Sequence, residues 1–231
     1  MNEVPKQRWG SLQWTMVVVI PGCLLMLVMN VILGARRAGE QMKAENHCMQ
    51  IILALGQYSK QQGAVYPDGR HPEFKSANQL FRELIKEGVV SSEAIFGCPG
   101  GAFNPDDDMG NPPNYESALM PGECHWMLLR HQSSASHGKT PIVIENSLSA
   151  TWPPKWYVSF WAGNKRGRAW YEESVVIVGR NDGSVSLEEL LPDGTLDWHS
   201  PNNLGPDGKS WIDSLTPEQI AKLAYWEIEE K

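Results

Sequence analysis

The range Thr15–Leu33 reads TMVVVIPGCLLMLVMNVIL and contains no charged side chain over nineteen residues. A helix of about 20 apolar residues spans the hydrocarbon core of a bilayer. Trp9 and Trp14 precede the run, where interfacial aromatic residues are expected, and Arg36 and Arg37 follow it. The stretch therefore predicts a membrane anchor near the N-terminus.

A cleaved secretory signal is the first rival interpretation of this run. The apolar region of such a signal is about 7–15 residues long and ends at small residues. This run is longer, and Gly34-Ala35 followed by two arginines is a poor exit site. We therefore expect a retained anchor. Basic residues flank it on both sides, so the positive-inside rule does not decide its orientation.

The rest of the chain is acidic and of ordinary domain size. Residues 35–231 carry a net charge of −8, against −7 for the whole chain. A surplus of negative charge argues against nucleic acid and against a basic membrane-surface role. The length predicts one domain with a sizeable core, built on a long helix.

Apolar periodicity continues from the anchor into this acidic part. Residues recur at spacings of three and four up to Gly63, which is a plausible helix stop: Ala44, Cys48, Ile51, Ile52, Leu55 and Tyr58. The pattern predicts a nearly continuous helix over residues 12–62. A second helix is predicted from Ala77 to Gly88, with Ser76 and Gln79 forming a capping box.

Strands are predicted after a long Gly-, Pro- and Asp-rich loop at residues 99–122. The candidates are His125–Leu129, Ile142–Glu145, Trp156–Trp161, Ser174–Gly179 and Val185–Leu190. A final helix is predicted from Pro217 to Ile228. Because a one-faced sheet and an amphipathic helix each need cover, we expect an α+β fold with an antiparallel sheet packed on residues 44–62.

Three cysteines lie in the soluble part. Cys48 is on the apolar face of the predicted long helix, and Cys98 follows a helix that should pack near it. A disulfide requires α-carbons within about 7 Å. We predict a disulfide between Cys48 and Cys98, with Cys98–Cys124 as the alternative because these two flank the long loop.

Several stretches occur in an order that resembles a known family. They are a basic leader ending at Gly10, the apolar helix, CMQIILALGQY at 48–58, GAVYP at 63–67, FGCP at 96–99 and VIVGRNDGSV at 176–185. The chain resembles type IV pilins and type II secretion pseudopilins, most closely the branch with large variable soluble domains in planctomycetes and verrucomicrobia.

The resemblance implies four regions and a structural role. Residues 1–14 would be a short cytoplasmic leader, 15–34 the transmembrane helix, 35–62 the amphipathic spine helix and 63–231 a periplasmic α+β domain. The chain would sit in the inner membrane by a single span. Its apolar helix would pack against lipid and other pseudopilins or inner-membrane secretion components, through the following residues: Val17, Val18, Ile20, Leu24 and Leu27.

The processing motif departs from the family pattern. The resemblance places peptidase cleavage between Gly10 and Ser11, but Ser-Leu-Gln-Trp-Thr follows Gly10 where the family has Phe-Thr-Leu-Ile-Glu. The missing glutamate would pair with a neighbouring subunit. Its absence leaves two interpretations open: a minor tip subunit, or a pilin-derived protein that does not polymerise.

The candidate chemical sites are few. The major secretion pseudopilin is known for a calcium loop, and Asp106 and Asp108 are the matching candidates here, although three consecutive aspartates are more typical of a solvated loop. No nucleophile elbow, phosphate loop or paired histidine motif occurs. We therefore expect no cofactor and no enzymatic activity.

The alternative function is a singly anchored binding module. Eight tryptophans lie in the soluble part, and the predicted strand Trp156–Trp161 would present aromatic side chains to both sides. One face would be core. The other is a candidate surface for a glycan or an envelope protein.

Overall fold

The computed structural model describes residues 19–158, 165–170 and 174–230. The chain divides into two units, residues 1–42 and 43–231. The helix α2, Ile20–Gln61, contributes to both. The described part of the predicted long helix is thus confirmed, whereas residues 12–18 lie outside the described residues.

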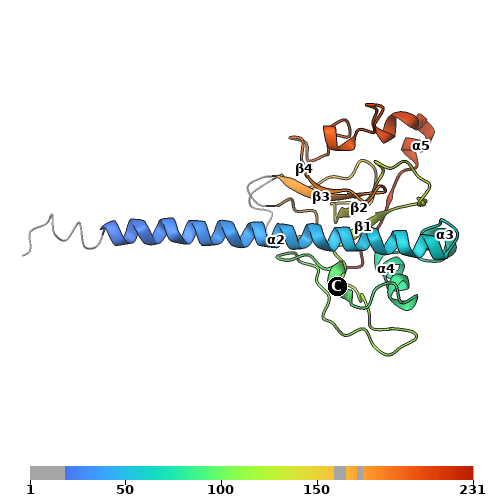
Figure 1. The fold of residues 1–231 in the computed structure, drawn as a ribbon, viewed down its shortest axis with the longest axis horizontal. Coiled ribbons are helices and arrows are strands. Elements are labelled where there is room, and N and C mark those ends of the chain that lie inside the picture. The colour runs from blue at the N-terminus through green and yellow to red at the C-terminus, as the bar shows by residue number, and fades with distance from the viewer. Residues whose placement is uncertain (1–18, 159–164, 171–173, 231) are drawn as a thin grey trace, which may run out of the picture. The chain divides into compact units, whose positions relative to one another are not determined.

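The second unit contains a five-stranded antiparallel sheet in the order β4-β3-β2-β1-β5 (Figure 1). The strands are β1 Trp126–Leu129, β2 Pro141–Glu145, β3 Val175–Arg180, β4 Val185–Glu189 and β5 Tyr225–Trp226. Four of them match predicted strands within one or two residues. The turn at Asn181-Asp182-Gly183 joins β3 to β4, because Arg180 N–H donates to the Ser184 carbonyl at 2.8 Å.

One face of the sheet packs on the second half of α2. Cys48, Ile51 and Leu55 are fully buried there. A side chain at Gly179 of β3 would lie 2.7 Å from Cys48 Sγ and 3.0 Å from the Ile52 side chain. Only glycine therefore permits this close approach of helix and strand. The predicted packing of the sheet on residues 44–62 is confirmed.

The other face is covered by the C-terminal segments, so the sheet lies between α2 and the chain that carries α5, Pro217–Ala221 (Figure 1). Short 3₁₀ helices at Pro201–Asn203 (η4) and Trp211–Ser214 (η5) belong to this cover. Arg180 points to it from β3, because its Nη2 donates to Asn203 Oδ1 at 2.7 Å. Burial on both faces explains why β1, β2 and β3 are buried at every residue.

Three shorter helices follow α2. They are α3 Pro67–Arg70, α4 Ala77–Lys86 and the 3₁₀ helix η2 Glu93–Phe96. Of these, α3 lies at the end of α2 (Figure 1), and η2 lies beside residues 50–57 of α2. Ser76 is the N-cap of α4, since its side chain accepts a hydrogen bond from the Gln79 N–H. The other half of the predicted capping box is not formed, because Gln79 Oε1 accepts from the Lys75 N–H instead. The long loop that follows η2 leads to β1.

Two predicted elements are wrong in the described residues. The C-terminal helix ends at Ala221 instead of Ile228, and Tyr225–Trp226 form β5 beside β1. Burying two aromatic side chains at the sheet edge outweighs the helical pattern, because Tyr225 is fully buried and its hydroxyl donates to the Pro141 carbonyl. Residues 156–158 are not a sheet strand either: Tyr157 only bridges to Arg168.

Candidate functional site

The first candidate surface is the apolar part of α2 in the N-terminal unit. Its large apolar side chains are between 42% and 72% exposed. They are Ile20, Leu24, Leu25, Met26, Leu27, Val28, Met29, Val31, Ile32 and Leu33. By length and composition, the helix α2, Ile20–Gln61, is long and apolar enough to cross a membrane.

The residues predicted for assembly and processing are only partly described. Ile20, Leu24 and Leu27 are each more than half exposed in α2. Val17 and Val18 lie outside the described residues, as do Gly10 and Ser11.

The predicted disulfide is not formed. Cys48, Cys98 and Cys124 are all buried, and none of the three is in a disulfide. Cys48 packs against Gly179, and the Cys98 thiol donates to Glu145 Oε1 at 3.7 Å. The alternative pair fails as well, because the Cys124 thiol donates to the Trp126 carbonyl at 3.3 Å. Burial raises the pKa of Cys124 to about 12 and that of Cys48 well above its usual range, so both stay protonated at neutral pH.

A buried polar cluster surrounds Glu145 at the end of β2. The Cys98 Sγ, a ring nitrogen of His125 and a carboxylate oxygen of Glu145 all lie within 4.8 Å of one another. Three such atoms at this spacing could hold a metal ion. The Glu145 carboxylate accepts hydrogen bonds from Trp170 Nε1 at 3.0 Å and from the Ile177 N–H at 2.9 Å. No sequence pattern marks this cluster, since Cys98, His125 and Glu145 come from three separate segments of the chain.

The hydrogen bonds of this cluster are complete without a metal. Asn146 Oδ1 accepts from the Gly167 N–H, which directs Asn146 Nδ2 to donate to His125 Nδ1 at 2.9 Å. His125 Nδ1 is then an acceptor, so its Nε2 carries the proton and donates to Glu145 Oε1 at 3.2 Å. This arrangement holds a buried carboxylate in the core, and its role is structural.

A second cluster consists of three carboxylates: Glu93 at the start of η2, Asp106 in the long loop, and Glu123 just before β1. Glu93 and Glu123 are buried, whereas Asp106 is exposed. Asp106 Oδ1 accepts from the Asp108 N–H at 2.9 Å. Asp108, the other residue predicted for calcium, is not part of the cluster, and its Oδ1 accepts from the Gly110 N–H.

The environment of Glu93 disfavours its charged form. Burial raises the pKa of Glu93, and the carboxylates of Glu123 and Asp106 raise it further. The N–H groups of Leu119 and Asp107 act in the opposite direction, and Leu119 N donates to Glu93 Oε2 at 2.9 Å. Glu93 Oε1 has no hydrogen-bond partner.

The tryptophans predicted as a possible binding surface are mostly core. Among the described residues, Trp126, Trp156, Trp170, Trp198, Trp211 and Trp226 are buried. Trp152 is half-buried and stacks near Trp198, with ring centroids 4.6 Å apart. Trp161 lies outside the described residues. The described tryptophans therefore offer core packing, not an aromatic surface for a glycan.

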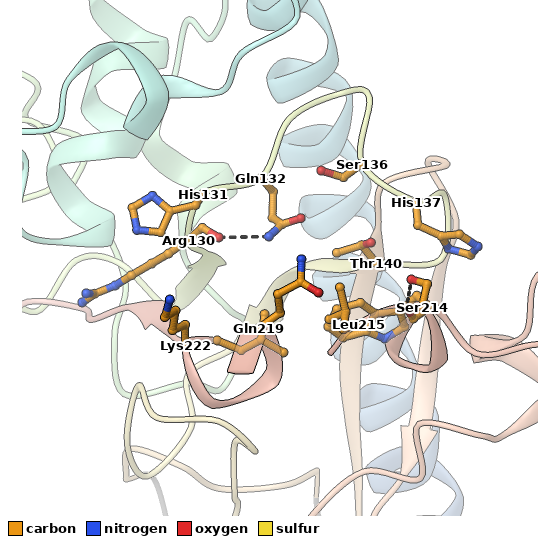
Figure 2. Close-up of a pocket in the computed structure, with 12 residues that line it drawn as sticks. Arg130, His131, Gln132, Ser136, His137, Thr140, Ser214, Leu215, Gln219 and Lys222 are labelled. Atoms are coloured by element: carbon orange, nitrogen blue, oxygen red, sulfur yellow. Dashed lines mark hydrogen bonds between the residues drawn. The ribbon is translucent and has the colours of Figure 1, made fainter. Parts of the chain in front are cut away.

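A cavity of about 430 Å³ opens between the end of β1 and the C-terminal segments (Figure 2). It is lined by Arg130, His131, Gln132, Ser136, His137, Thr140, Trp211, Ser214, Leu215, Gln219, Lys222 and Leu223. No carboxylate is among these lining residues. The amides, hydroxyls and cations around an apolar floor suit a polar or anionic ligand.

Arg130, one of the cationic side chains that line the cavity, already contacts other groups of the chain. Arg130 Nε donates to the Tyr225 carbonyl at 3.0 Å, and its guanidinium lies 4.2 Å from the centre of the Trp226 ring. In Figure 2 this guanidinium points away from Gln219 and Leu215. Besides Arg130, the cavity presents amide, hydroxyl and imidazole groups and the ammonium of Lys222.

Comparison with protein-family models, curated proteins and solved structures finds no match.

Proposed function

We propose that this protein is a membrane-anchored, pseudopilin-like structural subunit of a type II secretion-like or type IV pilus-like assembly, without enzymatic activity. One observation carries the proposal. A single helix, α2, is apolar and exposed over Ile20–Leu33 and buries its other half in the core of the folded domain. An exposed apolar helix is unstable in water and requires lipid or other helices around it.

The division of α2 fits anchoring combined with assembly. In a bilayer, apolar helices associate by close packing and not by the hydrophobic effect. Leu24 and Leu27 lie in the apolar part and offer side chains for such packing. The proposal places the N-terminus in the cytoplasm and residues 43–231 in the periplasm. The buried thiols of Cys48, Cys98 and Cys124 would be shielded from oxidation there.

The absence of enzymatic activity is part of the proposal. A catalytic site needs titratable groups that converge on a space that a substrate can reach. In the described residues, the cluster around Glu145 converges but is buried: His125 and Glu145 are each 3% exposed. The cavity of Figure 2 holds His131 and His137, but no carboxylate or cysteine lines it to act with them.

The second candidate function is a singly anchored binding module for a glycan or an envelope protein. The cavity of Figure 2 favours it, because amide and hydroxyl groups such as Gln132, Gln219 and Ser136 are suited to hydroxyl-bearing ligands. Both candidates share the anchor. They differ in whether the chain has other pilin-like subunits as neighbours in the membrane.

The test is purification of the full-length chain from its native membranes, followed by identification of the bound chains. We expect other pilin-like subunits with the unmodified protein. Replacing both Leu24 and Leu27 by Lys should release the chain from carbonate-washed membranes and remove those partners, since each charge near the centre of a span costs about 2.5–3.5 kcal/mol.

The matched control replaces Met42 and Leu53 by Lys. Both are exposed on the same helix and lie outside the apolar run, at 64% and 62% exposure. This variant should remain in the membrane and keep its partners. Retention of the anchor but purification without any pilin-like chain would favour the binding module instead.

A further inference from the structure

The polar groups of the cavity in Figure 2 divide into a basic end and an uncharged end. Arg130, His131 and Lys222 lie toward one side of the cavity in this view, and Ser136 lies toward the other. The Arg130 N–H donates to the Ala224 carbonyl at 2.9 Å, which places the residue after β1 beside the segment that carries Lys222. The basic side chains are therefore gathered at one end.

Lys222 is the cation that remains for a ligand at the basic end. It is exposed, and within residues 19–158, 165–170 and 174–230 its ammonium group forms no ion pair and no hydrogen bond. Arg130 adds a second positive charge, although its Nε is bound to the Tyr225 carbonyl. No carboxylate is among the lining residues to neutralise these charges. Such an end favours an anionic group.

The two glutamines of the cavity are held in fixed orientations by backbone groups. Gln219 Oε1 accepts from the Thr216 N–H at 2.8 Å, so Gln219 Nε2 remains as a donor. Gln132 Nε2 donates to the Arg130 carbonyl at 3.0 Å (Figure 2), so Gln132 Oε1 remains as an acceptor. A ligand with hydroxyl groups can bond to both amides, since a hydroxyl donates and accepts.

Two further groups of the cavity can bond to a ligand. His137 Nδ1 accepts from the Lys139 N–H at 3.2 Å, so in the neutral ring the proton is on Nε2, which can donate. Thr140 is only 2% exposed, yet its hydroxyl has no hydrogen-bond partner in the described part of the chain. Because buried polar groups normally have partners, this hydroxyl indicates a ligand that supplies one.

The two walls of the cavity are joined before any ligand binds. The Tyr225 hydroxyl donates to the Pro141 carbonyl at 3.2 Å, which ties the C-terminal segment to β2. Leu215 and Leu223 add apolar surface between the polar groups. A preformed site loses less conformational entropy on binding than one that must order itself.

We propose that this cavity binds an acidic sugar, that is, a hydroxylated ring with one anionic group. Lys222 holds the anionic group, and Gln132 and Gln219 bond to the ring hydroxyls. The volume of about 430 Å³ lies within the range of small-molecule sites, about 300–1,000 Å³. The assignment rests on the second candidate function, the binding module, and does not require pilin-like neighbours.

The experiment is titration calorimetry of the full-length protein in detergent at low salt, with glucuronate, glucose 6-phosphate, glucose and acetate as probes. An acidic sugar should bind at least about tenfold more tightly than glucose, because charge-assisted hydrogen bonds are about twice as strong as neutral ones. The tighter of the two acidic sugars identifies the anionic group as carboxylate or phosphate. Acetate, which has no hydroxyl groups, should bind more weakly than glucuronate.

Three variants locate the binding. Lys222→Met should fold, because residue 222 is exposed, and should bind the acidic sugar about tenfold more weakly, since it removes the charged donor. Gln219→Glu keeps the acceptor for the Thr216 N–H but replaces the Nε2 donor by a negative charge, so it should weaken acidic sugars more than glucose. Lys86→Met is the control, because it removes the same charge from an exposed lysine of α4 that does not line the cavity.

Equal affinity for glucose and both acidic sugars would overturn the choice of an anionic ligand. No binding of either acidic sugar, or unchanged affinity in Lys222→Met, would overturn the site. The purified chain is titrated without neighbouring chains, so a failure here leaves the assembly proposal intact. Purification without pilin-like partners would in turn leave this site intact.

Discussion

Leu55→Asp is expected to leave no folded domain. Leu55 lies in the half of α2 that packs under the sheet, and its side chain is fully buried. The variant loses the burial of a leucine, about 2–5 kcal/mol, and adds an unpaired buried charge that costs several kcal/mol more. The sum equals or exceeds the stability of a typical domain, about 5–15 kcal/mol.

The measurement is the yield and the near-UV circular dichroism of the full-length variant in detergent. Leu53→Asp is the control, because Leu53 is on the same helix two residues earlier and 62% exposed. It should fold and melt as the unmodified protein does. Normal yield and melting of Leu55→Asp would refute the packing of α2 on the sheet as the centre of the core.

The second large effect concerns Arg180 on β3. Its side chain is 1% exposed, its Nη2 pairs with Glu188 Oε1 at 2.6 Å, and its Nη1 donates to Ser186 Oγ at 2.7 Å. Arg180→Met leaves the carboxylate of Glu188 buried without its cation. Breaking a buried pair in this way costs about 3–5 kcal/mol.

Denaturant unfolding of three variants separates the contribution of the Arg180–Glu188 ion pair from the effect of a smaller side chain. Replacing both Arg180 by Met and Glu188 by Leu should recover much of the loss, since no charge then remains unpaired. Arg36→Met removes one member of an exposed pair with Glu40 and should cost less than about 0.5 kcal/mol. If the single Arg180→Met variant unfolds at the same denaturant concentration as the parent, the pair does not stabilise the core.

The elements with strong local signals were predictable. The apolar spacing of Ile51, Ile52 and Leu55 marks one face of a helix, and that face is the one buried. The three residues Asn181-Asp182-Gly183 are typical of a hairpin turn, and they predict the hairpin on their own. Ser76 likewise predicts the start of α4, because serine is a favoured N-cap residue.

The elements that depend on contacts between distant parts of the chain were not predictable from the sequence. Tyr225 and Trp226 read as part of a helix, yet they pair with β1, almost a hundred residues earlier in the chain. The cysteines were expected to pair with one another, but Cys98 contacts Glu145 and Cys48 contacts Gly179. Such choices depend on the packed core and leave no periodic pattern in the sequence.

The carboxylate cluster shows the same limit. Asp106 is a candidate ligand from the sequence, because its loop contains three consecutive aspartates. Glu93 and Glu123 gave no signal, since each stands alone beside a short helix or strand. Only the path of the long loop brings the three together. The sequence feature closest to Glu123 is the largely apolar run CHWMLL at 124–129, which it directly precedes.

The central claim is that the chain is a pilin-like subunit processed and anchored at its N-terminus, and the most direct test is the mass of the mature protein isolated from its native membrane. The account predicts that residues 1–10 are removed and that Ser11 is the new N-terminus. A chain that retains Met1, or one cut after the apolar run near Ala35, would contradict it.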